Sequence, residues 1–202
     1  MPADKLLDGL WRGPDSRLRC AWCRSEPIYV DYHDTEWGVP VYDDRRLFEK
    51  ITLEGFQSGL SWLIILRKRE NCRRAFANFE IERVARSTGR DVTRLLKNTG
   101  IVRHRGKIES AINNARRCED LIEEFGSLSN YVWRFEPEPR SRPKKLTWDV
   151  LRTLGSSPES TALSKELRRR GWTFVGPTTI YAFMQSMGVV NDHLHGCEFR
   201  IR

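Results

Sequence analysis

Residues 94–116 read RLLKNTGIVRHRGKIESAINNAR, and this pattern predicts two helices joined by a short basic turn. The turn lies at residues 98–100, and the second helix is expected to begin near Gly106. A glycine turn that opens a helix presents free backbone N–H groups, which suit a phosphate when cationic side chains lie beside them. The candidate phosphate contacts in this segment are Gly100, Arg103, Arg105, Gly106 and Lys107.

The predicted shape of this segment is that of a helix-hairpin-helix, a motif that binds DNA. Its turn, GIVRHRG at residues 100–106, lacks the hydrophobic-Gly-x-Gly centre that is typical of the motif. A corner between two helices with an exposed basic turn fits the same residues. The segment therefore indicates a mainly α fold and leaves the role of the turn open.

A second segment, LEGFQSGLSWLIIL at residues 53–66, has an unusual polar face. On one continuous helix, Glu54, Ser61 and Trp62 would lie on the same side. Small residues leave room for a ligand, a tryptophan supplies a stacking plane, and a carboxylate accepts hydrogen bonds or favours a cation. The alternative is a helix at an internal packing interface.

Cysteine and histidine residues near both ends of the chain have the spacing of metal ligands. Cys20 is followed by His33, and His193 is separated from Cys197 by three residues. Two cysteines and two histidines are a common tetrahedral zinc set, and four protein ligands leave no open position, so such a zinc would be structural. It would join distant parts of the chain. Cys20 and Cys23 also form a C-x-x-C pair, a motif of redox proteins, and isolated buried thiols are a further alternative.

The rest of the chain predicts further helices and one short strand. We expect residues 134–146 to form an exposed loop, because they contain three prolines and five basic residues. The best strand candidate is PIYVDY, residues 27–32. Helices are predicted over residues 42–77, 111–125, 157–170 and 177–188.

Composition predicts one basic globular domain. The 202 residues carry a formal net charge of +8, which favours polyanionic partners such as nucleic acid. We expect a flexible tail over residues 1–18 and a single domain over 19–202, with two helical lobes around a cleft. The start of the chain lacks the apolar core of a signal peptide, and the uncharged run 171–191 reads as a buried helix, so we expect a cytoplasmic protein with no membrane partner.

Long motifs in this sequence match a known family in the same order. They are RCAW (19–22), YHDTEWGVP (32–40), LFEKITLEGFQSGLSW (47–62), GIVRHRGKI (100–108), LSKELRRRGWTFVGPTTIYAFMQSMGVVNDH (163–193) and HLHGC (193–197). Together they resemble the 3-methyladenine DNA glycosylase I family, within the helix-hairpin-helix glycosylases. The resemblance spans about residues 19–200 and implies a compact helical glycosylase fold whose terminal segments are joined by one structural zinc ion.

The resemblance also implies roles for individual residues. Glu54 matches the carboxylate that contacts the base, so it is the expected catalytic and substrate-binding residue, with Tyr32 and Trp62 as pocket aromatics. Trp22 and Trp37 are expected in the wall or the core. Cys23 and Phe56 depart from the family pattern. We keep Cys20 as the first zinc ligand because it precedes the aromatic residue of the motif. The implied zinc ligands are Cys20, His33, His193 and Cys197.

The implied activity is hydrolysis of the N-glycosidic bond of 3-methyladenine in double-stranded alkylated DNA, after base flipping, by a monomer. The segment after the hairpin offers only Asp120 as an aspartate, far along its helix, and no lysine is an evident Schiff-base nucleophile. We therefore expect no strand nicking. Two alternatives remain: a zinc-stabilised module that binds damaged DNA without catalysis, and a glycosylase for other alkylated purines.

Overall fold

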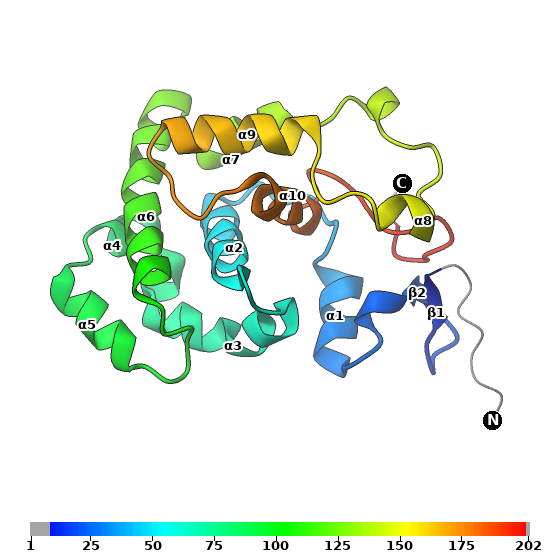
Figure 1. Cartoon of the computed structure of the whole chain (residues 1–202), viewed down its shortest axis with the longest axis horizontal. Coiled ribbons are helices and arrows are strands. Elements are labelled where there is room, and N and C mark those ends of the chain that lie inside the picture. Colours follow the sequence, from blue (N-terminus) through cyan, green and yellow to red (C-terminus); the bar gives the residue numbers. More distant parts are fainter. Residues whose placement is uncertain (1–8, 201–202) are drawn as a thin grey trace.

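A computed structural model describes residues 9–200, and these residues are mainly helical, as predicted (Figure 1). Two short strands form an antiparallel hairpin in which Leu10 is opposite Cys20. Short 3-10 turns occupy Ala21–Cys23, Ala77–Phe79, Trp133–Phe135 and Pro139–Ser141. The strands are β1 (Leu10–Arg12) and β2 (Leu18–Cys20), and the helices are α1 (Pro27–Thr35), α2 (Asp44–Gln57), α3 (Trp62–Ala75), α4 (Ile81–Ala85), α5 (Gly89–Lys97), α6 (Arg105–Phe125), α7 (Leu128–Val132), α8 (Trp148–Leu151), α9 (Pro158–Arg169) and α10 (Pro177–Ser186).

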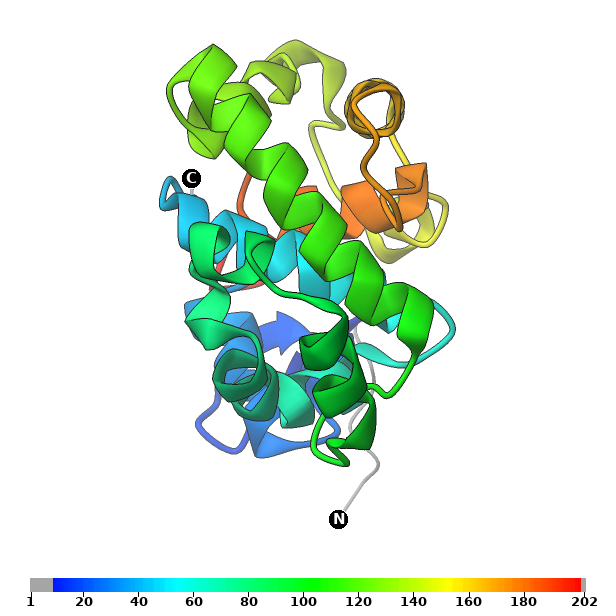
Figure 2. The same ribbon diagram turned by 90° about the vertical axis from the view of Figure 1, so that its left-hand side faces the viewer.

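Helices α2 and α10 lie at the centre of the molecule. Helix α10 packs against α2 and α9, while α6 packs against α2, α4 and α7. Figure 2 shows α6 running diagonally across the face of the molecule. One continuous hydrophobic core includes residues from Cys20 to Cys197, so both ends of the described chain contribute to it.

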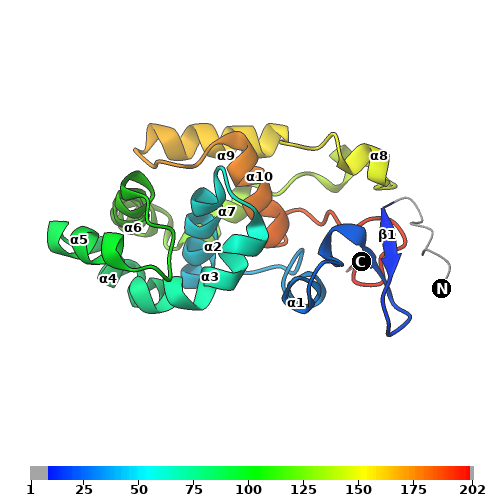
Figure 3. The same ribbon diagram turned by 60° about the horizontal axis from the view of Figure 1, so that its bottom comes forward.

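The N-terminal hairpin lies beside the C-terminal segment (Figure 3). Leu18 and Glu198 are joined by two hydrogen bonds, from Leu18 N to Glu198 Oε1 and from Glu198 N to Leu18 O, both 2.9 Å. The flexible tail predicted for residues 1–18 is therefore corrected, because residues 10–12 belong to a paired strand. Residues 1–8 lie outside the described part of the chain.

The strand predicted for residues 27–32 is wrong, because these residues form the first part of α1. Their β-branched residues suggested a strand, but Pro27 occupies the first turn of the helix, where its fixed φ and missing N–H are tolerated. In a helix, successive side chains point about 100° apart. Consequently, the adjacent residues Tyr32 and His33 face two different sites.

The single helix predicted for residues 42–77 is interrupted between α2 and α3. Gly59 has a φ of +78°, a left-handed conformation that ends the helix. The Ser61 side chain then accepts a hydrogen bond from Ile64 N at 3.4 Å and caps α3. The Asp43 side chain caps α2 by accepting a hydrogen bond from Arg46 N at 2.8 Å. Glu54 and Trp62 therefore come from two different helices.

The last two predicted helices are confirmed with small shifts in their ends. At the start of α9, Ser157 is the N-cap residue and forms a capping box with Ser160, and Pro158 occupies the first turn. Pro177 occupies the first turn of α10. Residues of α10 are largely buried, as expected for the uncharged run. Across residues 9–200, no helix is both long enough and apolar enough to cross a membrane.

Candidate functional site

Four residues from the two ends of the chain form a buried cluster that could hold a metal ion. Their ligand atoms all lie within 4.8 Å of one another. Cys23 lies outside this cluster, and its thiol instead donates to the Cys20 carbonyl at 3.2 Å. The geometry therefore answers the question left by the C-x-x-C pair. The members of the cluster are Cys20, His33, His193 and Cys197, as predicted.

Hydrogen bonds orient both histidine rings of the cluster. His193 Nε2 lies 2.8 Å from the Trp37 carbonyl oxygen, which can only accept, so Nε2 carries the proton. Nδ1 is therefore unprotonated, and it faces Cys197 Sγ at 3.4 Å. His33 Nδ1 lies 2.8 Å from Asp34 Oδ1, so its Nε2 faces the cluster. Arg19 in turn pairs with Asp34. Such outer contacts hold a metal-binding imidazole in the required tautomer.

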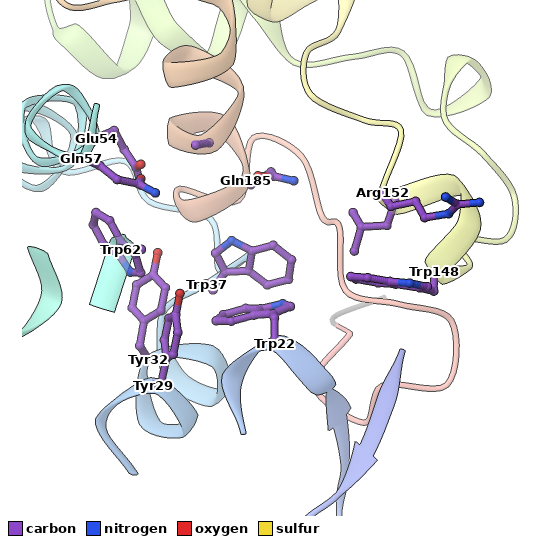
Figure 4. A pocket seen from close by; sticks show the side chains of 12 residues that line it. Trp22, Tyr29, Tyr32, Trp37, Glu54, Gln57, Trp62, Trp148, Arg152 and Gln185 are labelled. Carbon is purple, nitrogen blue, oxygen red and sulfur yellow. The ribbon is translucent and has the colours of Figure 1, made fainter. Parts of the chain in front are cut away.

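A pocket of about 330 Å³ lies beside this cluster (Figure 4). It is formed where α1 and the segment after β2 meet α2, α3, α8 and α10. Six of its twelve lining residues are aromatic. Its lining residues are Trp22, Tyr29, Tyr32, Trp37, Glu54, Gln57, Trp62, Trp148, Leu151, Arg152, Ala182 and Gln185.

Glu54 is the carboxylate of this pocket. Only 5% of the residue is exposed, and its side chain has no hydrogen-bond or ion-pair partner within residues 9–200. Burial raises the pKa of Glu54 to about 7, an effect that the positive charge of Lys50 partly opposes. A buried carboxylate without a partner costs free energy in the empty protein, and a ligand with amino groups or positive charge would remove that cost.

The rings of Tyr32 and Trp62 form one side of the pocket. Their centroids are 5.4 Å apart, with planes inclined at 44°. Figure 4 shows the Tyr32 hydroxyl and the Glu54 carboxylate pointing into the same space, from α1 and α2 respectively. The structure thus brings together the three residues predicted for the pocket, although the continuous helix assumed for Glu54 and Trp62 is absent.

Trp22 and Trp37 connect the pocket with the metal cluster. Both line the pocket, as walls, and their ring centroids are 5.0 Å apart in an edge-to-face arrangement. The Trp37 carbonyl accepts the hydrogen bond from His193. Gly38 has a φ of +77°, and a side chain there would meet the His193 ring at about 3.0 Å. His193 of the cluster therefore supports the pocket wall directly.

The predicted hairpin consists of α5, a connection over residues 98–104, and α6. Arg103 is exposed on this connection and Arg105 is exposed in the first turn of α6, whereas the His104 side chain caps α6 by accepting from Lys107 N at 3.2 Å. A Cβ at Gly100 would lie 3.0 Å from the Asn71 side chain, so the turn and α3 approach each other closely here. The turn therefore presents the Arg103 guanidinium to solvent, and the exposed Arg105 guanidinium forms an ion pair with Glu109 at 3.1 Å.

The predicted phosphate contact at Lys107 is corrected by the structure. Only 6% of the residue is exposed, and its ammonium group donates to the carbonyls of Phe56 at 2.8 Å and Ser58 at 2.6 Å. These carbonyls lie at the end of α2, where the helix itself provides no N–H partner, so Lys107 caps that helix. It thereby links the hairpin to the pocket. Its sequence position beside Arg105 gave no signal of this burial.

Several residues around the pocket escaped sequence reasoning. Lys50 lies one turn before Glu54 on α2 and is buried behind the rings of Tyr32 and Trp62. The helical spacing of Lys50 and Glu54 could have suggested that they share a face. Trp148 and Arg152 lie across the pocket from Glu54 (Figure 4), in a segment between the predicted loop at 134–146 and the predicted helix at 157–170 that was assigned no element or role.

Asp120 lies outside the pocket. It is exposed on α6 and forms an ion pair with Arg117 at 3.3 Å. Among the described residues that line the pocket, Glu54 is the sole carboxylate. Any catalysis by a carboxylate in this pocket would therefore depend on Glu54.

Comparisons with known proteins agree with this geometry. Residues 22–201 match the family model for methyladenine glycosylase. The chain is 44% identical over 182 residues to the DNA-3-methyladenine glycosylase of Haemophilus influenzae, covering 89% of this chain and 96% of that one. It is 45% identical over 179 residues to DNA-3-methyladenine glycosylase 1 of Escherichia coli, covering 89% and 95%.

Solved structures show the same similarity. A crystal structure of 3-methyladenine DNA glycosylase I has a TM-score of 0.81 with 47% identity, covering 89% of this chain and 98% of that one. A structure of 3-methyladenine DNA glycosylase I from Staphylococcus aureus, which describes the structural basis of 3-methyladenine recognition, is also similar. Its TM-score is 0.83 with 35% identity, covering 91% of this chain and 97% of that one.

Proposed function

The chain belongs to the methyladenine glycosylase family, and we propose that it removes 3-methyladenine from double-stranded alkylated DNA by hydrolysing the N-glycosidic bond. The observation that carries the proposal is Glu54, a buried carboxylate without a hydrogen-bond or ion-pair partner among the described residues, in an aromatic pocket. Methylation at N3 makes the adenine of the nucleotide cationic. A slot with aromatic faces and one carboxylate suits a flat cation.

The reaction requires the target nucleotide to leave the base stack, since its glycosidic bond is not accessible within the duplex. In our proposal the extruded base lies between the rings of Tyr32 and Trp62 on one side and Trp22 on the other. Glu54 accepts from the adenine amino group and stabilises the positive charge. Water attacks C1′, the C1′–N9 bond breaks with its electron pair passing to N9, neutral 3-methyladenine leaves, and the attacking water releases one proton to solvent as it becomes the C1′ hydroxyl. Tight desolvated binding and orientation provide the assistance that such a good leaving group needs.

The exposed face of the hairpin supplies the proposed contact with DNA. Arg103 and Arg105 are solvent-exposed cations, of which Arg105 is paired with Glu109, and we propose that the backbone at Gly100 and Gly106 contacts phosphate beside them. Phosphate contacts of this kind set the register of a protein on DNA. Lys107 contributes indirectly, because it ties the hairpin to the end of α2 that carries Glu54. We propose that the protein acts as a monomer.

Replacing both Arg103 and Arg105 by alanine should weaken binding to duplex DNA of any sequence. Each lost phosphate contact should reduce the slope of log K against log salt by about 0.9, so the double variant should lose about 2 from that slope. The measurement is DNA affinity across a salt series. A matched R45A/R46A variant removes two exposed arginines from the far end of α2 and should keep the wild-type slope. Equal slopes for all three proteins would exclude the hairpin contact.

We propose that the cluster of Cys20, His33, His193 and Cys197 holds one zinc ion. The donor chemistry fits: two thiols and two imidazoles, each imidazole with its outer nitrogen engaged, converge within 4.8 Å. Four protein ligands complete a tetrahedral shell, so the ion would supply structural cross-linking and no catalysis. Its position behind Trp37 would hold the pocket wall in place.

The ionisation of Glu54 predicts a pH dependence of base release. Because burial raises the pKa of Glu54 to about 7, the carboxylate is lost as pH falls through that value. The rate of 3-methyladenine release at subsaturating DNA should therefore rise between about pH 6 and pH 8. The check is a rate profile at constant ionic strength. A profile that is flat over this range would contradict a role for ionised Glu54.

Incubation with methylated duplex DNA tests the function. Chromatography of the released bases should show 3-methyladenine, with 7-methylguanine retained in the DNA. Release of other purines would support the broader glycosylase, and DNA binding without release would support the damage-binding module. Borohydride should trap no covalent complex, because the proposed reaction uses water and forms no Schiff base.

A further inference from the structure

Lys50 is a buried lysine behind the pocket wall. Only 4% of the residue is exposed, and it precedes Glu54 by one helical turn on α2. Its Nζ lies 4.5 Å from the centroid of the Tyr32 ring and 4.4 Å from that of Trp62. It also donates to the Tyr32 hydroxyl oxygen at 3.2 Å. Lys50 does not line the pocket itself, so it reaches a bound base only through these neighbours.

The contact between Lys50 and Tyr32 has a defined direction. An ammonium group has three donors and no acceptor, so the Tyr32 oxygen must accept and its own proton must point elsewhere. Burial lowers the pKa of Lys50 to about 8, while Glu54 and Glu36 oppose this effect, so the ammonium form predominates at neutral pH. The Tyr32 hydroxyl is directed towards the space that Glu54 also faces (Figure 4). A ligand atom that meets Tyr32 there would find a donor.

We propose that Lys50 is a positioning residue that makes Tyr32 the hydrogen-bond donor of the pocket, opposite Glu54 as its acceptor. This inference rests on the proposed function. The resulting pattern selects a base edge that has an amino donor beside a ring-nitrogen acceptor. Adenine presents this pair, with its N6 amino group beside N7. Guanine presents two acceptors, O6 and N7, and O6 would face the Glu54 carboxylate.

The rival explanation is that Lys50 only fills space and stabilises the rings by cation–π contacts. The two explanations differ in their dependence on the Tyr32 hydroxyl. If Lys50 acts by directing that hydroxyl, its removal should have no further effect once the hydroxyl is absent. If it acts by packing or through Glu54 alone, its effect should persist. A double-mutant cycle separates these cases.

The experiment compares wild type, K50M, Y32F and the K50M/Y32F double variant. Two quantities are measured: the rate of 3-methyladenine release from methylated duplex DNA, and the affinity for free 3-methyladenine from the quenching of tryptophan fluorescence. We expect K50M and Y32F each to lower the release rate about tenfold, and the double variant to match Y32F. An additional tenfold loss in the double variant, or a wild-type rate for K50M, would overturn the proposal.

Controls keep the outcomes distinct. K165M removes an exposed lysine on α9 and should leave both quantities unchanged. K50R retains a charged donor and should recover more activity than K50M, whereas a packing role predicts that the bulkier K50R is the poorer variant. Thermal unfolding of each variant reports stability separately. If the wild type binds free 3-methyladenine but does not release this base from methylated DNA, the proposed function is refuted. If wild type and K50M release the base from DNA at equal rates, only the role of Lys50 is refuted.

Discussion

Replacing Glu54 by glutamine should lower the rate of 3-methyladenine release by about a hundredfold while the protein stays folded. The change removes the negative charge that would face a cationic base, at nearly constant side-chain volume. It can also direct an amide N–H₂ towards the adenine amino group, so that two donors meet. Removal of one electrostatic contact to the developing charge in an enzyme commonly costs about a hundred- to a thousandfold in rate. The measurement is single-turnover base release.

Glu49 provides the matched control for this variant. It is also a largely buried glutamate on α2, but its carboxylate pairs with Arg73 of α3 at 2.8 Å and does not line the pocket. E49Q should therefore reduce stability and leave the rate of base release near that of wild type. If E54Q released 3-methyladenine as fast as E49Q, with both proteins folded, the assignment of Glu54 would be wrong.

The sequence predicted the residues of the cluster and of the pocket better than it predicted the local secondary structure. The four cluster residues and the trio of Tyr32, Glu54 and Trp62 were predicted because their residue types are specific and their order along the chain matches a family. The structure brings both sets together. Periodicity was less informative. The β-branched Ile28 and Val30 favoured a strand, although Pro27 and the buried face of α1 produce a helix.

The features that the sequence could not predict depend on contacts between distant segments. Lys107 resembles its basic neighbours in sequence, but the carbonyls that bury it lie about fifty residues earlier in the chain, at the end of α2. Lys50 likewise becomes notable only when α1 and α3 bring rings against it. A charged side chain in a sequence is expected to be exposed, and burial becomes visible only when its partners are placed.

Metal removal should have the largest effect on stability. The cluster joins residues 20 and 33 to residues 193 and 197, and its ligands converge only in the folded chain. The free energy of metal binding is therefore part of the free energy of folding. Even a loss of several kcal/mol should lower the unfolding temperature by about 10 °C or more in a chain of this size. The measurement is thermal unfolding of the zinc-loaded protein with and without a strong chelator.

Two cysteine variants separate metal binding from ordinary packing. C197A removes one ligand, so its unfolding temperature should already be low and should no longer respond to the chelator. C23A removes a thiol that is fully buried but lies outside the cluster, so it should be destabilised only by the small cavity and should keep the full response. Because His193 also supports the Trp37 carbonyl, loss of the metal should weaken the pocket before the whole protein unfolds. A C23A protein that is insensitive to the chelator, with a sensitive C197A protein, would instead assign the ligand role to Cys23.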